Sequence, residues 1–259
     1  MAKKDAETQR IFNTEWLHRL QVQYPWFCGY AIAPVMFFFG ASYGATSLTV
    51  LSRLPPLLVS SSSPSGDAAV SAAALGAKLL FCGHFVRRAL EVIYVNDYTG
   101  TFVRDSRGEL VYYAVWGLMA GTAAGTLPLS TYGVVNSSLR LAGAVLFVIG
   151  QIGNYWCHSH LRELRAEKKA LGTHKYVIPS AGPFQYVATP HYSFELLSWL
   201  GYWIHGGLDV TGAILLLMSV SSMGPFAGAR YAKYLELFKE GDRSGGDPST
   251  RWKLVPGLW

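Results

Sequence analysis

The chain has 259 residues, of which 51% are hydrophobic and only 15% are charged, and its formal net charge is +6. About a quarter of the residues of a soluble globular domain are charged, so this composition excludes both an ordinary soluble domain and an intrinsically disordered chain. Its long uncharged stretches indicate instead a protein that is embedded in lipid.

Stretches long enough to cross about 30 Å of hydrocarbon recur along the chain. Residues 20–52, 110–139, 141–161, 176–194 and 210–229 contain no Asp, Glu, Lys or Arg, and between Asp67 and Val86 the only charged residue is Lys78. Backbone amides in lipid must be paired within their own segment, and no alternating barrel pattern is present, so these spans are predicted to be helices. We predict an all-α, polytopic membrane bundle of six helices, near residues 26–48, 67–86, 110–128, 139–161, 184–204 and 210–229. The amphiphilic stretch 11–24 leaves a seventh membrane helix open.

Positive charge falls on one side of this predicted bundle. With six spans both chain ends share a side, and that side receives all of the 22 Lys and Arg residues except Arg53, Lys78 and Arg140. The positive-inside rule therefore places both termini in the cytosol. The residues before position 20 are polar and lack the apolar core of a cleaved signal peptide, so we expect the first span to direct insertion. Residues 1–259 are expected to form a single membrane-embedded domain.

The fourth predicted span carries a polar stripe. Asn154, His158, Arg162 and Arg165 occur at i, i+4, i+8 and i+11, which places them on one helix face that runs from membrane depth to the cytosolic surface. Arginines that anchor a helix end, together with one hydrogen-bonded Asn, would explain this stripe without a ligand. The alternative, which we favour, is a binding lane for a long anionic ligand, with the arginines on its phosphates.

The fifth predicted span contains a carboxylate within an apolar stretch. Glu195 must be protonated, paired with a cation or His191, or hydrogen-bonded to a ligand, and we favour contact with a ligand. Tyr192 and Trp199 share its helical stripe at i−3 and i+4, although Tyr192 could also be an interfacial aromatic residue. Pro190 is expected to bend this helix and to free backbone carbonyls.

The second predicted span has a polar face at its cytosolic end. His84, Arg87 or Arg88, Glu91 and Tyr94 recur there at helical spacing. The two arginines could equally be charges that stop membrane transfer.

Several familiar sites are missing from the sequence. It has no Gly-x-Gly-x-x-Gly before a helix and no Walker loop, so a nucleotide would have to bind within the helix bundle. His158 and His160 diverge on a helix, and we predict no metal site. Nucleic acid is not expected as a partner, because the basic residues are divided among several loops and chain ends.

Five segments of the chain, taken together, resemble a known family. They are His84-Phe-Val-Arg-Arg-Ala-Leu-Glu91, Gly150-Gln-Ile-Gly-Asn154-Tyr-Trp-Cys-His158 with Leu161-Arg-Glu-Leu-Arg165, Pro190-His-Tyr-Ser-Phe-Glu195-Leu-Leu-Ser-Trp199-Leu-Gly-Tyr202, Tyr234-Leu-Glu-Leu-Phe238 and Val255-Pro-Gly-Leu-Trp259. In this order they resemble the steroid 5α-reductase superfamily over residues 80–259, and most of all its very-long-chain trans-2-enoyl-CoA reductases.

The resemblance implies a multi-pass oxidoreductase of the endoplasmic reticulum that acts on CH–CH groups. It implies NADPH as the cofactor and an α,β-unsaturated carbonyl compound as the substrate, most specifically trans-2-enoyl-CoA in fatty-acid elongation. Membrane lipids and other enzymes of the elongation cycle would be its partners. Addition of hydride to the β-carbon places negative charge on the carbonyl oxygen, so the reaction needs a hydrogen-bond donor and a proton source.

The same resemblance assigns roles to individual residues. Steroid reductases have a tyrosine where this chain has Phe85, whereas Tyr192 aligns with the proton-donating tyrosine of enoyl-CoA reductases. Tyr192 and Glu195 are therefore the predicted catalytic residues. Predicted cofactor-binding residues are Arg88, Asn154, His158, Arg162, Arg165, His191, Arg230 and Tyr234.

Three other functions stay open at this point. A steroid 5α-reductase or another reductase of 4-ene-3-ketones is the first alternative. A membrane methyltransferase that uses S-adenosylmethionine is the second, although Thr189-Pro190-His191-Tyr192 reverses the His-Pro order typical of those enzymes. A binding-only or scaffold protein is the third, and it would tolerate loss of the Tyr192 hydroxyl.

Overall fold

A computed structural model describes residues 27–42, 64–95, 106–130, 136–172, 177–241 and 245–258. Within these ranges the chain is helical and contains no strand, only one isolated bridge between Val187 and Trp252. The helices are Phe27–Ser42, α2 (Pro64–Tyr94), α3 (Ser106–Ser130), α4 (Ser137–Ala170), α5 (Pro190–Gly206) and α6 (Val210–Lys239), with short 3-10 turns at η1 (Gly182–Gln185) and η2 (Pro248–Thr250). The predicted all-α class is therefore confirmed for the described residues. The amphiphilic stretch 11–24 lies outside them.

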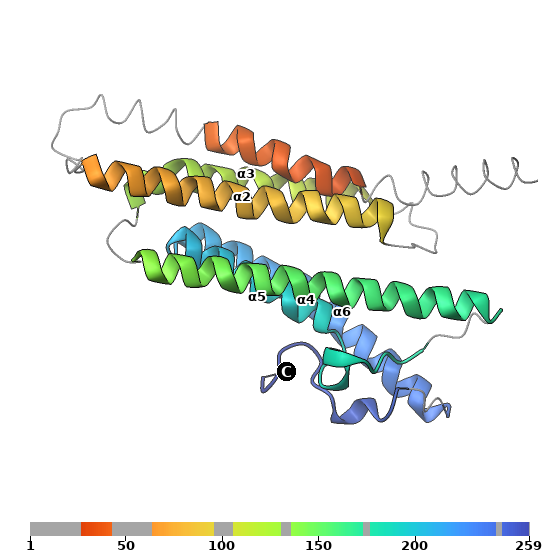
Figure 1. The fold of residues 1–259 in the computed structure, drawn as a ribbon. Helices are drawn as coiled ribbons and strands as arrows, with labels where there is room; N and C mark the ends of the chain where they lie inside the picture. The colour runs from red at the N-terminus through yellow and green to blue at the C-terminus, as the bar shows by residue number, and fades with distance from the viewer. Residues whose placement is uncertain are drawn as a thin grey trace, which may run out of the picture.

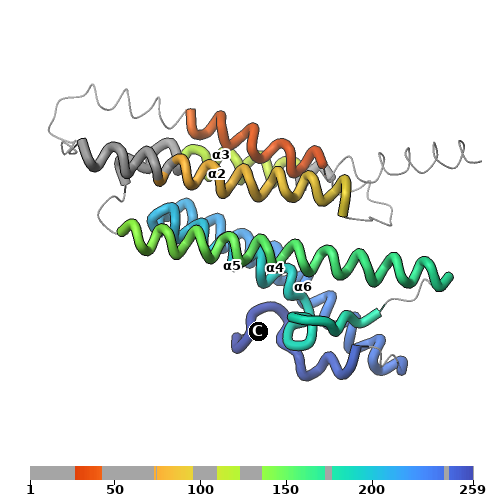
Figure 2. The backbone as a smooth tube through the Cα atoms, in the orientation of Figure 1, coloured from red at the N-terminus to blue at the C-terminus, as the bar shows by residue number. Residues whose placement is uncertain are grey.

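The helices form two groups. Phe27–Ser42 (red), α2 and α3 lie in one group, and α4, α5 and α6 lie in the other (Figure 1). The long axes of both groups run in roughly the same direction, and α6 extends beyond α5 to η2 in the C-terminal segment (Figure 2). This arrangement leaves the inner faces of α2, α4 and α5 directed at one another.

Small residues bring the backbones of α4 and α5 close together. A Cβ atom added at Gly150 would lie 2.5 Å from the carbonyl oxygen of Phe194, and one added at Gly201 would lie 2.5 Å from that of Gly143. Gly117 and Gly121 of α3 approach the helix Phe27–Ser42 in the same way. Close helix contact through small residues is typical of membrane bundles, where packing replaces the hydrophobic effect between helices.

An aromatic core joins the two groups. Phe37, Phe81 and Phe85 are fully buried, and Trp116 and Trp199 are nearly so. The rings of Trp116 from α3 and Trp199 from α5 lie 4.5 Å apart, and the ring of Phe81 from α2 lies 6.1 Å from that of Trp199. The two groups therefore share one core rather than forming separate units.

Helix length and hydropathy bear on the predicted spans. Among the described residues Val210–Lys239 is long and apolar enough to cross a membrane, and Phe27–Ser42 and Leu110–Thr122 are shorter apolar helices. Large apolar side chains are exposed on the outside of the bundle, including Phe39, Leu141 and Leu217 at 65–67%. These features fit a membrane bundle, and the count of six spans stays a prediction.

The structure corrects the start of the fifth helix. We predicted a span over 184–204 bent at Pro190, but residues 184–189 belong to η1 and the loop that follows it, and α5 begins at Pro190. Proline is favoured in the first turn because its missing N–H would have no intrahelical partner there. The prediction of a bend at Pro190 is therefore wrong.

Candidate active site

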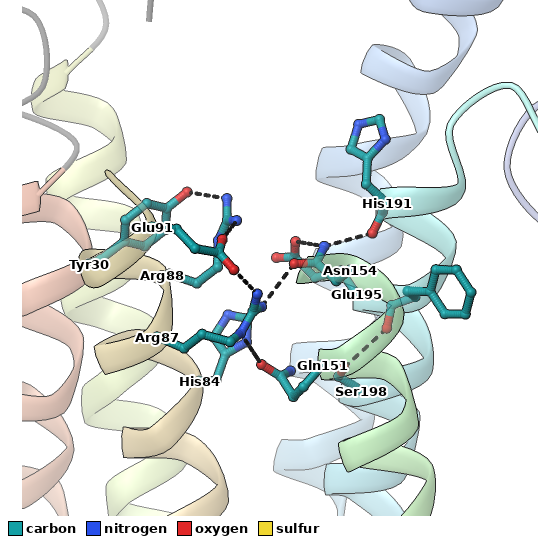
Figure 3. Close-up of polar contacts among 11 residues, drawn as sticks. Tyr30, His84, Arg87, Arg88, Glu91, Gln151, Asn154, His191, Glu195 and Ser198 are labelled. Carbon is teal, nitrogen blue, oxygen red and sulfur yellow. Dashed lines mark hydrogen bonds and ion pairs between the residues drawn. The ribbon is translucent and has the colours of Figure 1, made fainter. Parts of the chain in front are cut away.

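A network of polar side chains lies between α2 on one side and α4 and α5 on the other (Figure 3). It is surrounded by the aromatic core, where a polar atom without a partner costs free energy. Its members come from four helices and include Tyr30, His84, Arg87, Arg88, Glu91, Gln151, Asn154, His191 and Glu195.

Arg87 connects α2 to α4. Its Nε donates to Oε1 of Gln151 over 2.8 Å, and its Nη2 donates to Oδ1 of Asn154 over 2.8 Å. Its Nη1 forms an ion pair with Glu91 one turn along α2. All three guanidinium nitrogens are thus used, and they hold two helices together.

Asn154 connects α4 to α5. The side chain is fully buried, and its Nδ2 donates to the backbone oxygen of His191 over 2.8 Å and to Oε2 of Glu195 over 3.3 Å. The predicted ligand-contacting residues Asn154 and Glu195 therefore touch each other. The Glu195 side chain is half-buried.

Arg88 faces away from this connection. Its Nη1 pairs with Glu91, and its Nη2 donates to the Tyr30 hydroxyl over 3.0 Å. The guanidinium carbon also lies 5.0 Å from the centre of the Tyr30 ring. Arg88, the arginine predicted to bind the cofactor, thus contacts the first described helix, while its neighbour Arg87 faces Asn154.

Three rings continue the site along α4 and α5. The ring centres of His158 and His191 lie 5.5 Å apart, and those of His191 and Tyr192 lie 4.1 Å apart. His191 is 8% exposed, and its Nδ1 has no hydrogen-bond partner among the described residues. A buried ring nitrogen in this state is a ready contact for a ligand.

The remaining predicted cofactor residues occupy two different environments. Arg162, Arg165 and Arg230 are exposed, and Arg165 and Arg230 lie within electrostatic range of His191. Tyr234 is 2% exposed and packs in a small apolar cluster with Ile178 and Ala188. Arg165 and Arg230 therefore lie near His191, and Tyr234 supports the loop before α5.

The C-terminal segment fastens that loop. The Ala188 N–H donates to the Trp252 carbonyl over 2.8 Å, and the Trp252 N–H donates to that of Tyr186 over 2.9 Å. The Thr189 hydroxyl donates to the Lys253 carbonyl over 2.7 Å. The start of α5, where His191 and Tyr192 lie, is thus held by residues at the far end of the chain.

Sequence reasoning missed part of this network. It noted that either Arg87 or Arg88 shares a helical spacing with Glu91 and chose Arg88 for the cofactor, whereas it is Arg87 that contacts α4, and it assigned Gln151 no role. Gln151 lies one turn before Asn154 on the same helix face, a signal that was present in the spacing. Nothing in the sequence pointed to Tyr30.

Comparison with known proteins places this site in a family. The sequence model described as 3-oxo-5-alpha-steroid 4-dehydrogenase matches residues 103–259, more than half of the chain. The chain belongs to the steroid 5α-reductase family. The resemblance seen in the motifs is thereby confirmed, and members of this family are reductases that generally use a nicotinamide cofactor.

Several relatives within or near this family are reductases of lipid-like compounds. A very-long-chain enoyl-CoA reductase of Dictyostelium discoideum is 31% identical over 178 residues, which cover 68% of this chain and 55% of the relative. The 3-oxo-5-alpha-steroid 4-dehydrogenase 1 of Mus musculus is 27% identical over 187 residues, or 69% of this chain and 66% of the relative. Polyprenal reductase 2 of Oryza sativa subsp. indica is 30% identical over 115 residues, which cover 44% of this chain and 30% of the relative.

These comparisons support an oxidoreductase. The apolar helix Val210–Lys239 is consistent with a membrane protein. The chain spans about half the length of the Dictyostelium enoyl-CoA reductase that it matches. Membership of a reductase family favours reduction over the methyltransferase alternative.

Proposed function

We propose that this protein uses NADPH to reduce a carbon–carbon double bond conjugated to a carbonyl group in a lipid-like substrate. The most specific form of the proposal is reduction of trans-2-enoyl-CoA to saturated acyl-CoA in fatty-acid elongation. The observation that carries it is the contact of Asn154 with Glu195 and with the backbone of His191, next to Tyr192. This contact joins the predicted catalytic and cofactor residues in one network.

The donors of the site suit a phosphorylated dinucleotide. Nδ1 of His191, which has no partner in the described part of the chain, and the amide–carboxylate pair of Asn154 and Glu195 suit a nicotinamide carboxamide, which both donates and accepts hydrogen bonds. The exposed Arg162, Arg165 and Arg230 suit phosphates, because guanidinium groups bind them in a fixed fork geometry. NADPH, when bound, supplies the hydride.

The chain itself has to supply a proton and to stabilise the carbonyl oxygen. A tyrosine hydroxyl is protonated at neutral pH and can donate to an oxygen that gains negative charge. The Tyr192 ring lies against the His191 ring at the start of α5, a position that the C-terminal segment fastens. We therefore assign the proton donor to Tyr192. Glu195, fixed by the amide of Asn154, is assigned to orienting the cofactor.

The substrate class depends on Phe85. This side chain is fully buried among Tyr30, Tyr113 and Trp116 and has no hydroxyl to place near a steroid ketone. That favours an acyl-CoA substrate. Steroid reduction stays the second candidate, because the matching family description and the mouse relative both name a steroid dehydrogenase.

A substrate panel tests the proposal. The purified chain is incubated with NADPH and either trans-2-hexadecenoyl-CoA, a 4-ene-3-ketosteroid or a polyprenal, and oxidation of NADPH is followed. We expect the fastest oxidation with the enoyl-CoA. Oxidation with the steroid alone or the polyprenal alone would reassign the substrate, and no oxidation with any of the three would overturn the proposal.

We also propose that the protein resides in the endoplasmic reticulum membrane with both termini in the cytosol. The one-sided distribution of Lys and Arg supports this orientation. A glycosylation acceptor inserted after residue 60 should be modified in microsomes, and one inserted after Gly172 should not. The reverse pattern would contradict the orientation.

A further inference from the structure

Arg87 occupies a position that the proposed chemistry does not use directly. It donates to Asn154, whose side chain contacts the His191 carbonyl and the Glu195 carboxylate of α5, and its charge also lies within electrostatic range of Glu195. Its own side chain is 20% exposed, and its Glu91 partner is 2% exposed. The arrangement is a relay that runs from Glu91 through Arg87 and Asn154 to Glu195 (Figure 3).

Which side of Asn154 accepts and which side donates hydrogen bonds in this relay depends on how its amide is oriented. An amide has nearly the same shape when its oxygen and nitrogen are exchanged, so its neighbours must select the orientation. With the oxygen toward Arg87, the Asn154 NH₂ group faces two acceptors, the His191 carbonyl and the Glu195 carboxylate. With the amide reversed, donors would face the guanidinium and the oxygen would face both acceptors, so every contact would be repulsive.

We infer that Arg87 is a positioning residue, which fixes the Asn154 amide so that it holds Glu195 and the start of α5 in place for the nicotinamide end of the cofactor. This inference rests on the proposed function. Arg87 acts through Asn154, because its guanidinium is already engaged by Gln151, Asn154 and Glu91. A direct role on the phosphates is assigned instead to the exposed arginines.

Replacement of Arg87 leaves the rest of the network paired. Glu91 keeps Arg88 as an ion-pair partner in Arg87→Met, and Gln151 keeps its contact with His84 Nδ1, 3.1 Å away. Asn154 keeps both acceptors of its NH₂ group but loses the donor to its oxygen, Arg87 Nη2, which helps to hold the amide in this orientation. The substitution therefore isolates the relay more cleanly than removal of Glu91, which would leave two buried arginines without their carboxylate.

Two ligands separate positioning from general damage. We would measure the binding of NADPH and of 2′-phospho-ADP-ribose, which lacks nicotinamide, to the detergent-solubilised full chain by titration calorimetry. Arg87→Met should weaken the affinity for NADPH by about tenfold, which is the loss expected for one hydrogen bond from a charged group. The affinity for 2′-phospho-ADP-ribose should change by no more than about twofold. Lys78→Met, which removes another positive charge from α2, should change neither.

A double substitution tests whether the effect passes through Asn154. In an Asn154→Leu background, Arg87→Met should weaken NADPH no further than about twofold, because coupled residues are not additive. If Arg87→Met fails to fold, Arg87→Lys replaces it. Lysine keeps the charge but cannot reach three partners at once, so the affinity for NADPH should fall by about threefold while the affinity for 2′-phospho-ADP-ribose stays the same.

The outcomes distinguish this inference from the proposed function. Equal weakening of both ligands, full additivity with Asn154→Leu or unchanged NADPH binding would overturn the role of Arg87 while the function stands. Absence of NADPH binding to the unsubstituted chain would overturn the proposed function, and the inference with it.

Discussion

At the scale of single residues, the site combines groups that each need another to be stable in an apolar bundle. Glu195 has the amide of Asn154, Glu91 has two arginines, and His191 has one buried nitrogen without a partner among the described residues. A buried nitrogen in this state is available to a ligand, as the proposed function requires.

Tyr192→Phe tests the residue on which the proposed proton transfer depends. The substitution removes only the hydroxyl, so turnover of trans-2-hexadecenoyl-CoA should fall by about 10²-fold or more, the usual contribution of a positioned acid. NADPH affinity, measured by calorimetry, should change by less than about twofold, since phenylalanine keeps the ring packing.

The matched control for this substitution is Tyr155→Phe. Tyr155 is 47% exposed on α4 and has no place in the network, so its loss should leave turnover unchanged. Turnover retained in Tyr192→Phe would remove Tyr192 from its role.

Helical spacing in the sequence brought out part of the candidate site, and the family resemblance supplied the rest of the predicted residues. The spacing placed Asn154 and His158 on one face and Tyr192 and Glu195 on another, and the structure brings those two faces together. It could not separate Arg87 from Arg88, because consecutive residues point about 100° apart and only packing decides which one meets α4. Tyr30 is a contact over a long sequence separation, and such contacts leave no local signal.

At the scale of helices, contact between α4 and α5 holds the site together. The uncharged stretches predicted where most helices lie, because lipid requires apolar, internally bonded segments. They could not define the helix ends. An uncharged stretch looks the same whether it is a helix or an uncharged loop, so the loop before Pro190 was joined to α5. The Gly-Pro pair at the start of η1 is the signal that distinguishes them.

Gly150→Ala tests this contact. A Cβ atom there would lie 2.3 Å from the Ser198 hydroxyl oxygen and 2.5 Å from the Phe194 carbonyl, so the backbones must separate. We expect a loss of about 1–3 kcal/mol in the free energy of unfolding, and lower NADPH affinity. Thermal unfolding in detergent, followed by circular dichroism, measures the first.

Gly83→Ala is the control for the same chemical change. A Cβ atom at Gly83, on the exposed face of α2, would meet nothing within 4 Å. Because alanine is the better helix former, stability should be unchanged or rise by up to about 1 kcal/mol. An equal change in both variants would show that contact between α4 and α5 does not decide the result.

At the scale of the whole molecule, the C-terminal segment completes the site from a distance. Arg251 is 6% exposed and donates to the Pro179 carbonyl over 2.6 Å and to that of Gly245. Burial lowers the pKa of its guanidinium, which still remains charged at neutral pH. The positive charge thus ties the chain end to the loop that leads into α5.

Arg251→Met should release this tie. Two carbonyls lose a charged donor, so we expect a loss of about 2–3 kcal/mol in the free energy of unfolding, together with weaker NADPH binding as the start of α5 loosens. Lys239→Met, which removes an exposed charge, should have neither effect. Unaltered stability in Arg251→Met would mean that the segment contributes little to the fold.

The transfer of a labelled hydride tests the proposed function most directly. The full chain is incubated with NADPH that carries deuterium at both C4 positions and with trans-2-hexadecenoyl-CoA, and the product is examined by mass spectrometry. We predict saturated hexadecanoyl-CoA with a single deuterium, located on the β-carbon. Unreacted enoyl-CoA, or a saturated product without deuterium, would contradict the most specific form of the proposal, reduction of enoyl-CoA by hydride from NADPH.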